Sequence, residues 1–261
     1  MESQFTEKQI NLQGYSTLYL EAGAATDSLP ILFLHGWSVS TEPYQESLTA
    51  LSQRYRVIAP DLPGFGRSTT PQFVQTYNDY VNYIVAFANE LKLKNFHLMG
   101  HSMGGAIAIV LAASFPSMIS SLTLVDSTGI PLGSVLEVLL RRSIEMSAQM
   151  WEVKPKPLSQ IIQAVFQNWC FRSQNVIQSA QLSLEEDLRP LLSKIESPTL
   201  VLWGANDLLT PLNFAQEIAQ GIKGSQTEIV KDRYHEWSIF QPEKFAPIIF
   251  KFLDAIEEKQ Y

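Results

Sequence analysis

Residues 100–104 read Gly-His-Ser-Met-Gly and fit the pattern G-x-S-x-G, in which a serine occupies a sharp turn between a strand and a helix. The apolar run 96–99 before it predicts a short buried strand, and the small-residue run 104–109 predicts the start of a helix. A serine at such a junction has a strained backbone, which pushes its hydroxyl out of the sheet. Glycine is expected at both ends of the pattern, because a Cβ atom there would collide with its surroundings. Since a helix N-terminus favours a developing negative charge, Ser102 is predicted to be a nucleophile.

A serine hydroxyl needs a base to take its proton, and the chain offers four histidines. His97 lies inside a predicted strand, where it is expected to be a core residue with its hydrogen bonds satisfied. His101 is the neighbour of Ser102 and should point away from it, and His35 begins the turn after an earlier strand. His235 lies on a loop after the last predicted strand, so we expect His235 to be the base.

The histidine in turn needs a carboxylate that orients it, and two aspartates are candidates. Asp207 follows the predicted strand 199–203, and it comes after the serine and before His235 in the chain, as this arrangement requires. Asp126 follows the predicted strand 122–125 and could also reach the histidine, or it could instead cap the turn after it. Asp207 is the favoured orienting acid, and Asp126 is the alternative.

The negative charge that forms on a substrate oxygen needs two backbone N–H donors. The first is expected from Met103, the residue after the nucleophile. The second is expected from Trp37 in the segment 35–38, where Gly36 allows the backbone to approach closely. The Trp37 side chain is also a candidate for binding substrate, with ordinary packing of a loop aromatic as the alternative.

The rest of the sequence predicts a mostly parallel sheet that positions these residues. Residues 5–12 and 16–21 alternate in polarity around a turn and predict an antiparallel hairpin. Continuous apolar runs then alternate with helical patterns, which indicates an α/β fold with helices on both faces of the sheet. The apolar runs are 31–34, 56–59, 96–99, 122–125, 199–203 and 227–230. The helical patterns are clearest at 80–91, 104–114 and 243–257.

The segment 127–183, which we call the lid, interrupts this alternation. It contains no convincing strand and three helical stretches, at 132–150, 158–169 and 175–181. We therefore expect a core formed by residues 1–126 and 184–261, with the lid inserted over the strand ends. The lid has more apolar positions than its helices need for packing on each other, and some should face an acyl pocket. These positions are Val135, Leu139, Met146, Met150, Ile161, Val165 and Trp169, of which Leu139, Met146 and Trp169 are the predicted substrate-binding residues.

Composition limits the classes of partner. The 261 residues carry a formal net charge of -7, which argues against binding to nucleic acid or to an anionic membrane surface. The single cysteine, Cys170, excludes an internal disulfide, has no metal-site spacing, and is interpreted as a buried structural thiol. The polar start of the chain lacks the plan of a signal peptide, and the longest apolar stretch, 106–113, is too short to cross a bilayer. We therefore expect a soluble cytoplasmic protein with no metal.

Together these segments resemble the α/β-hydrolase superfamily over essentially the whole chain. The resemblance implies serine hydrolase chemistry through an acyl-enzyme, with no cofactor. Its matching pieces are 34–37 (Leu-His-Gly-Trp), 61–68 (Asp-Leu-Pro-Gly-Phe-Gly-Arg-Ser), 100–105 (Gly-His-Ser-Met-Gly-Gly), 203–207 (Trp-Gly-Ala-Asn-Asp) and the loop around His235.

Within this superfamily the segments 35–37 and 61–68 look like the pimeloyl-acyl-carrier-protein methyl ester esterase family of biotin synthesis and its carboxylesterase relatives. That resemblance implies an acidic acyl-carrier protein as a possible partner. The lid is locally basic, which would suit such a carrier, and Arg141 and Arg142 would steer its approach. The alternative is a solvated helix face. The charges concerned are Arg141, Arg142, Lys154, Lys156 and Arg172 against Glu137, Glu145 and Glu152.

The leading hypothesis is a carboxylesterase that acts on small or medium acyl esters. The same frame also supports carbon–carbon hydrolysis of dienone acids, cofactor-free haloperoxidation and thioester hydrolysis. A slow-turnover ligand sensor that signals through its lid is a hypothesis of a different class. A serine at position 102 argues against epoxide hydrolases and haloalkane dehalogenases, which use an aspartate there.

Overall fold

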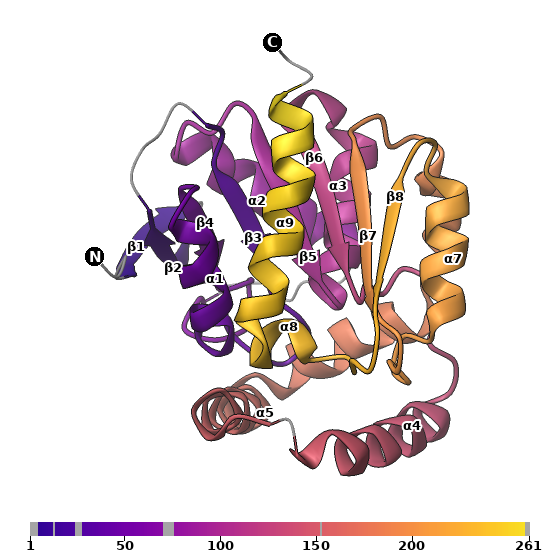
Figure 1. Ribbon diagram of the computed structural model, residues 1–261. Coiled ribbons are helices and arrows are strands. Elements are labelled where there is room, and N and C mark those ends of the chain that lie inside the picture. The colour runs from indigo at the N-terminus through magenta and orange to yellow at the C-terminus, as the bar shows by residue number, and fades with distance from the viewer. Residues whose placement is uncertain (1–4, 13, 24–27, 70–75, 152, 259–261) are drawn as a thin grey trace.

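Eight strands form one sheet in the order β1-β2-β4-β3-β5-β6-β7-β8 (Figure 1). The computed structural model describes residues 5–12, 14–23, 28–69, 76–151 and 153–258. The β1–β2 and β2–β4 pairs are antiparallel, and every later pair is parallel, which confirms the predicted hairpin and the mostly parallel sheet. The strands are β1 (Thr6–Leu12), β2 (Tyr15–Ala22), β3 (Ile31–Leu34), β4 (Val57–Pro60), β5 (Phe96–His101), β6 (Ile119–Val125), β7 (Thr199–Gly204) and β8 (Gln226–Val230).

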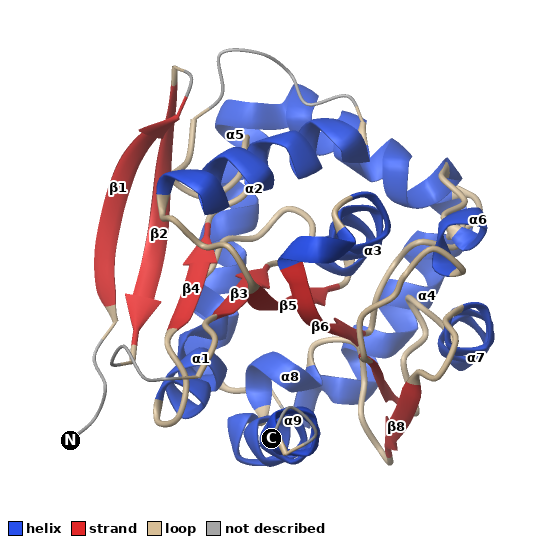
Figure 2. Cartoon of the chain, turned by 90° about the horizontal axis from the view of Figure 1, so that it is seen from above, coloured by secondary structure: helices blue, strands red, loops and turns tan. Residues whose placement is uncertain are grey.

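Helices cover both faces of the sheet, as the view from above shows (Figure 2). Strands β3, β4, β5 and β7 are buried along their whole length, because apolar cores lie on both sides of them. One face carries α2 (Tyr77–Glu90), α3 (Met103–Ser114), α6 (Arg189–Leu192) and α7 (Leu212–Gly221). The other carries α1 (Gln45–Ser52), α8 (Trp237–Phe240) and α9 (Pro242–Glu257), and the short helices η1 (Glu42–Tyr44) and η2 (Pro116–Met118) complete the core.

The predicted helical insertion is present between β6 and β7. It consists of α4 (Val135–Ala148), η3 (Gln149–Trp151) and α5 (Pro155–Glu185). In Figure 1 these helices lie beneath the sheet, across the ends of the strands that lead into the candidate site. Arg172 has non-helical angles (φ -142°, ψ 28°) and kinks α5, so the two stretches predicted at 158–169 and 175–181 are the two arms of one bent helix.

Helix α4 has the opposite orientation from the one expected from its apolar spacing: its polar side faces the core and its apolar side faces solvent. Its buried side chains are polar, Glu145 together with the adjoining Gln149, whereas Leu139 and Met146 are 58% and 55% exposed. The prediction that Leu139 and Met146 line an acyl pocket is therefore wrong in this structure. The reason is that charged groups elsewhere in the fold bind the polar side of α4, which turns its apolar side to solvent.

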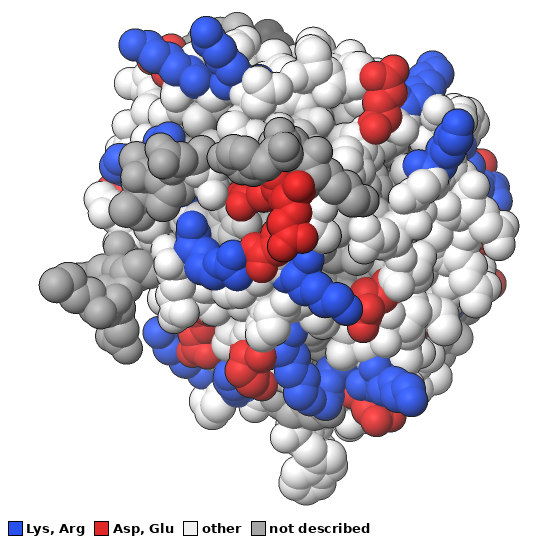
Figure 3. Space-filling model, turned by 45° about the horizontal axis from the view of Figure 1, so that its top comes forward, with Lys and Arg blue, Asp and Glu red and all other residues white. Residues whose placement is uncertain are grey.

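The structure also bears on the expectations about the cysteine, the surface charge, membrane spans and metal sites. Cys170 is exposed on α5, so its interpretation as a buried structural thiol is wrong. On the face drawn in Figure 3, basic and acidic side chains lie interspersed and form no single-sign stripe. Within the described ranges, no helix is long and apolar enough to cross a membrane. No group of three His, Cys, Asp or Glu side chains in those ranges is placed to hold a metal ion.

Candidate active site

Ser102 lies between the end of β5 and the start of α3, at the predicted turn. Its backbone angles, φ 55° and ψ -121°, are strained for a residue with a side chain, and such conformations cost about 1–3 kcal/mol each. Two backbone hydrogen bonds tie the turn to the neighbouring strand: the N–H of Ser102 donates to the carbonyl of Val125 (3.0 Å), and its carbonyl accepts from the N–H of Thr128 (3.1 Å). Both contacts come from β6 and the loop after it, so the neighbouring strand supports the strain.

The two glycines of the pattern are required by close packing. A Cβ atom on Gly100 would lie 2.2 Å from the carbonyl oxygen of Gly104, and one on Gly104 would lie 2.2 Å from that of Leu34. Any side chain at either position would push α3 away from β3 and β5. These contacts are the physical basis of the spacing from which the turn was predicted.

The structure brings Asp207 and His235 together. Oδ2 of Asp207 lies 2.8 Å from Nδ1 of His235, and both side chains are buried. Thr210 fixes the carboxylate: its hydroxyl donates to Oδ2 (2.6 Å) and its N–H donates to Oδ1 (2.8 Å). Thr210 was not identified from the sequence, although its position three residues after Asp207 is typical of a side chain that accepts hydrogen bonds from its own turn.

Asp126, the alternative acid, points elsewhere. Its Oδ1 accepts a hydrogen bond from the N–H of Gly204 (2.7 Å), and its Oδ2 accepts one from Nε1 of Trp237 (2.8 Å). Burial, with Asp207 nearby, raises the pKa of Asp126 well above its usual range. Of the two carboxylates, only Asp207 therefore hydrogen-bonds the imidazole of His235 among the contacts of the described residues.

The pKa of His235 is raised above the usual value for an imidazole. Burial alone would lower its pKa, but the negative charge and hydrogen bond of Asp207, helped by Glu236 and Glu145, raise it to about 9. Three carboxylates thus favour the charged form of this histidine. In a site where His235 acts as base, they would stabilise the imidazolium that forms when it takes a proton.

This environment predicts the pH dependence of the reaction. A base must be neutral to accept a proton, so kcat/KM for an uncharged ester should rise with pH through a midpoint above the ordinary 6.5 and towards about 9. The measurement is kcat/KM at closely spaced pH values, with spontaneous hydrolysis subtracted. A midpoint at or below 6.5 would show that the carboxylates do not act on His235 in this way.

The segment 35–38 lies against Ser102. A Cβ atom on Gly36 would be only 3.4 Å from the Cβ of Ser102, so the backbone on both sides of Gly36 lies beside the serine. His35 holds this segment: its Nδ1–H donates to the carbonyl of Gly36 (2.8 Å) and its Nε2 accepts from the N–H of Leu62 (2.9 Å). Met103 begins α3, where backbone N–H groups have no partner inside the helix. The predicted donors of Trp37 and Met103 therefore belong to segments on either side of Ser102.

Trp37 and Trp169 meet where the lid touches this segment. Their rings make an edge-to-face contact with centroids 6.3 Å apart. The indole N–H of Trp37 donates to the carbonyl of Val176 on α5 (3.0 Å), and buried Asn168 on the same helix donates to the carbonyl of Ser38 (3.1 Å). Of the predicted substrate-binding residues, Trp37 and Trp169 are thus brought together at the site, unlike Leu139 and Met146.

His101 links the serine to the histidine loop. Its Nε2 donates to the carbonyl of His235 (2.9 Å), so its Nδ1 accepts from the hydroxyl of Tyr44 (2.8 Å). The same hydroxyl accepts from the N–H of Gly36 (3.1 Å). Burial lowers the pKa of His101 to about 3, which keeps it neutral and suits this pattern. The hydrogen bonds of the described residues include none between the Ser102 hydroxyl and His235. The bond from His101 goes to the backbone carbonyl of His235, so it fixes the histidine loop beside the turn that holds Ser102.

His97 only partly meets its expectation as a satisfied core residue. Its Nδ1 lies 2.8 Å from the hydroxyl of Ser121, while its Nε2 is buried without a hydrogen-bond partner among the described residues.

Two residues that contact the site, Tyr44 and Glu145, were not identified from the sequence. Each reaches the site from a distant element, and neither belongs to a motif.

Comparison with known proteins identifies the family of the chain. Residues 30–176, more than half of the chain, match the family described as the alpha/beta hydrolase fold. The chain is similar to the AB hydrolase superfamily protein YisY of Bacillus subtilis (strain 168), with 29% identity covering 87% of this chain and 92% of that protein. It is similar to the human monoacylglycerol lipase ABHD6, with 26% identity covering 95% and 82%.

Among solved structures, a membrane phospholipase A described as a bacterial virulence factor superposes with a TM-score of 0.83. The identity is 26%, and the match covers 97% of this chain and 87% of that one. A putative lipase from Acinetobacter baumannii AYE superposes equally well at 23% identity, which establishes likeness of fold. The family match, the eight-stranded sheet and the helical insertion together show that this chain belongs to the α/β-hydrolase fold family.

Proposed function

We propose that this chain is a serine hydrolase of carboxylic esters, with Ser102 as nucleophile, His235 as base and Asp207 as the acid that orients His235. The observation that carries the proposal is the buried 2.8 Å contact between Asp207 and His235. The loop of His235 is fixed by His101, the residue before a serine in a strained strand–helix turn. The N–H groups of Trp37 and Met103 are the proposed donors to the oxyanion.

The proposed reaction proceeds in two halves. As the Ser102 Oγ bonds to the ester carbonyl carbon, its proton passes to His235, and the carbonyl electron pair moves onto oxygen to give the oxyanion. When that pair returns, the bond to the alcohol oxygen breaks and the alcohol leaves with the proton from His235. Water then attacks the acyl-enzyme and loses a proton to His235. The bond between the acyl carbon and the Ser102 Oγ breaks, His235 returns its proton to Oγ, and the carboxylic acid leaves.

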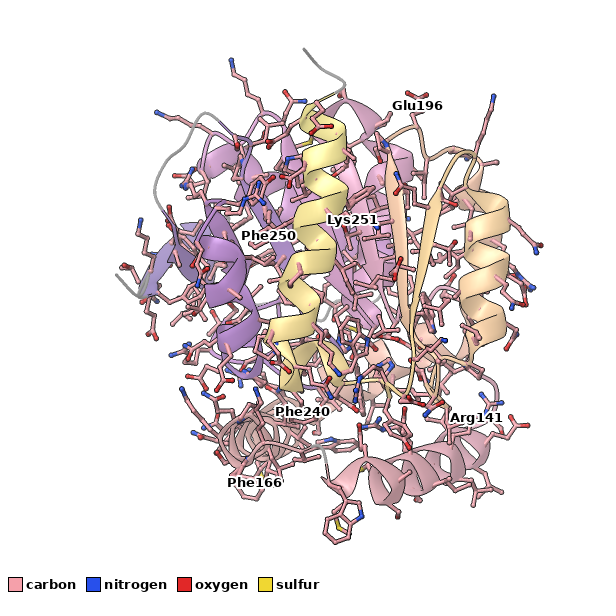
Figure 4. The ribbon with its side chains drawn as sticks, in the orientation of Figure 1. Arg141, Phe166, Glu196, Phe240, Phe250 and Lys251 are labelled. Carbon is pink, nitrogen blue, oxygen red and sulfur yellow. The ribbon has the colours of Figure 1, made fainter. Side chains whose placement is uncertain are left out.

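We further propose that the acyl group is lipophilic. Every large hydrophobic side chain that is strongly exposed among the described residues lies on the lid. Apart from Trp169, these side chains face solvent rather than the proposed site, so they support a lipophilic substrate as an apolar surface that it can contact, not as the lining of an acyl pocket. In Figure 4, Phe166 lies on the outer side of α5, away from the sheet. Two similar proteins are described as a monoacylglycerol lipase and a membrane phospholipase A, which supports the same class. The exposed residues are Val135, Leu136, Leu139, Leu140, Ile144, Met146, Met150, Trp151, Ile162, Phe166, Trp169, Phe171 and Ile177.

A panel of chromogenic esters of increasing acyl length tests both parts of this proposal. We expect turnover within the usual enzymatic range, about 1–1000 per second. Trp169→Ala should lower kcat/KM for the preferred acyl length by about tenfold and flatten the length profile, because Trp169 contacts Trp37 beside the nucleophile. Phe171→Ala is the matched control, since Phe171 is an aromatic on the same helix and is 79% exposed. An unchanged profile in Trp169→Ala would remove the lid from substrate selection.

The acidic acyl-carrier partner receives less support from the structure. Arg142, one of the two arginines expected to steer a carrier, points inward and pairs with Glu145 and Glu236. Arg141 remains at the lid surface, where it donates to the carbonyl of Leu132 (3.2 Å). The pimeloyl carrier ester would therefore have to be recognised by other means, and a small lipophilic ester is the better supported substrate. Hydrolysis of dienone acids but not esters by the same serine would instead identify a carbon–carbon hydrolase.

A further inference from the structure

A buried carboxylate of the lid contacts both loops of the proposed acid–base pair. Glu145, on α4, has a fully buried side chain. Its Oε1 accepts hydrogen bonds from the backbone N–H of His235 (2.9 Å) and of Leu208, the residue after Asp207 (3.3 Å). One oxygen atom therefore joins the loop after β7 to the loop after β8, and it does so from a helix outside the core.

The remaining polar groups on this side of α4 hold Glu145 in place. Arg142 donates through Nη1 to Oε2 of Glu145 (2.9 Å) and bonds the carboxylate of Glu236 with both terminal nitrogens. Gln149 donates through Nε2 to the same carboxylate (2.9 Å). Positions 142, 145 and 149 share one helical side, so α4 meets the residue beside His235 with a continuous polar surface.

We propose that Glu145 is a positioning residue for the reaction, which keeps Asp207 and His235 in their hydrogen-bonded geometry and makes the docked lid part of the acid–base machinery. The inference rests on the proposed function of these two residues. A buried charge is retained only where it is paired and hydrogen-bonded, and here the bonds go to the backbone of the catalytic loops. Simple packing of α4 on the core would need no charge at this point.

Glu145 contributes in two ways that can be separated by substitution, through its hydrogen bonds and through its charge. The hydrogen bonds of its oxygen fix the loops. Burial raises the pKa of Glu145, and the pairing with Arg142 opposes that shift and favours the carboxylate. Its negative charge favours the imidazolium of His235 together with Asp207 and Glu236, and Asp126 and His101 also lie near this imidazole. Glu145→Gln keeps an acceptor oxygen and removes the charge, whereas Glu145→Ala removes both. Glu137→Gln is the matched control, because Glu137 is a carboxylate on the same helix whose side chain caps the N-terminus at Ser134.

The first measurement is steady-state kinetics of the full chain. Glu145→Ala should lower kcat by about a hundredfold with little change in KM, as expected for a small displacement of reacting groups. Glu145→Gln should recover most of that loss, and Glu137→Gln should match the wild type. Folded Glu145→Ala with unchanged kcat would overturn the proposal, and so would a rise in KM alone.

The second measurement is a titration of the His235 imidazole by NMR, which needs no substrate. Loss of the charge in Glu145→Gln should lower the pKa of His235 by about one unit, whereas Glu137→Gln should leave it unchanged. An unchanged pKa in folded Glu145→Gln would contradict the proposal. If the wild type hydrolyses no ester, the proposed function fails, but the titration still decides whether the lid acts on His235. Glu145→Gln also serves if the alanine variant does not fold.

Discussion

Replacement of Ser102 by alanine is expected to lower kcat for ester hydrolysis by about 10⁶-fold, because the acyl-enzyme route loses the atom that bonds to the carbonyl carbon. The fold should be retained. Alanine accepts the same φ of 55° as serine, and the supporting hydrogen bonds to Val125 and Thr128 are made by the backbone. The free energy of unfolding should therefore change by less than about 1 kcal/mol. Steady-state kinetics and thermal unfolding of the two proteins check both statements.

Ser121→Ala is the matched control for the loss of a buried hydroxyl. Ser121 lies on β6, next to the strand that ends in Ser102, and its hydroxyl contacts His97 away from the site. We expect this variant to keep wild-type kcat while losing some thermal stability. Substantial activity in folded Ser102→Ala, or equal losses in both variants, would show that Ser102 is not the nucleophile.

Asp207→Asn is expected to lower kcat by about 10⁴-fold. An asparagine can turn its N–H₂ group towards Nδ1 of His235, which favours the wrong tautomer, and the charge that raises the pKa of His235 is lost. The midpoint of the pH profile should therefore fall from its raised position in the same variant. The N–H of Thr210 would still donate to the amide oxygen, so the loop should keep its conformation.

Asp126→Asn is the control that distinguishes orientation of His235 by Asp207 from the effect of any buried carboxylate near the site. Asp126 is fully buried, but it bonds Gly204 and Trp237 rather than the imidazole. We expect a loss of stability of about 1–3 kcal/mol, because an amide cannot accept from both donors, and a loss of kcat below about tenfold. A larger catalytic loss in Asp126→Asn than in Asp207→Asn would reverse the assignment of the orienting acid.

The elbow could be predicted because its constraints are local. The contacts that exclude a side chain at Gly100 and Gly104 involve residues within the motif or on the adjacent strand β3. The continuous apolar strands could also be predicted, because a strand that is buried on both faces has apolar residues at successive positions rather than an alternation of apolar and polar ones. The order of serine, acid and histidine along the chain then favoured Asp207 and His235, and both follow parallel strands, β7 and β8, whose loops lie at one edge of the sheet.

The spacing of residues in the sequence could not decide between Asp126 and Asp207, because the direction of each carboxylate depends on the local backbone conformation and its hydrogen bonds. Both follow neighbouring parallel strands, β6 and β7, and so arrive at the same edge of the sheet. The positive φ of Asp126, 43°, accompanies a carboxylate that faces Gly204, whereas the hydroxyl of Thr210 fixes Asp207 towards the histidine. Chain order favoured the residue that makes the contact, but it could not exclude the other.

Within the lid, the orientation of α4 was not predictable, because periodicity identifies the faces of a helix and not their neighbours. In α4 the apolar spacing predicted an inward side at Leu139 and Met146, as in an ordinary surface helix. The inward side is instead set by Glu236, which lies 94 residues beyond Arg142 in the chain and pairs with it in the fold. A polar side that is buried and an apolar side that is exposed can be recognised only once the partner of the helix is known.

The central claim, that Ser102 is an activated nucleophile, is tested most directly by covalent labelling with a fluorophosphonate. The account predicts one label per chain, located on the peptide that contains Ser102, and loss of ester turnover in proportion to labelling. Asp207→Asn should be labelled far more slowly, because its histidine no longer accepts the serine proton in the correct tautomer. Labelling of another residue, or full turnover after complete labelling of Ser102, would contradict the account.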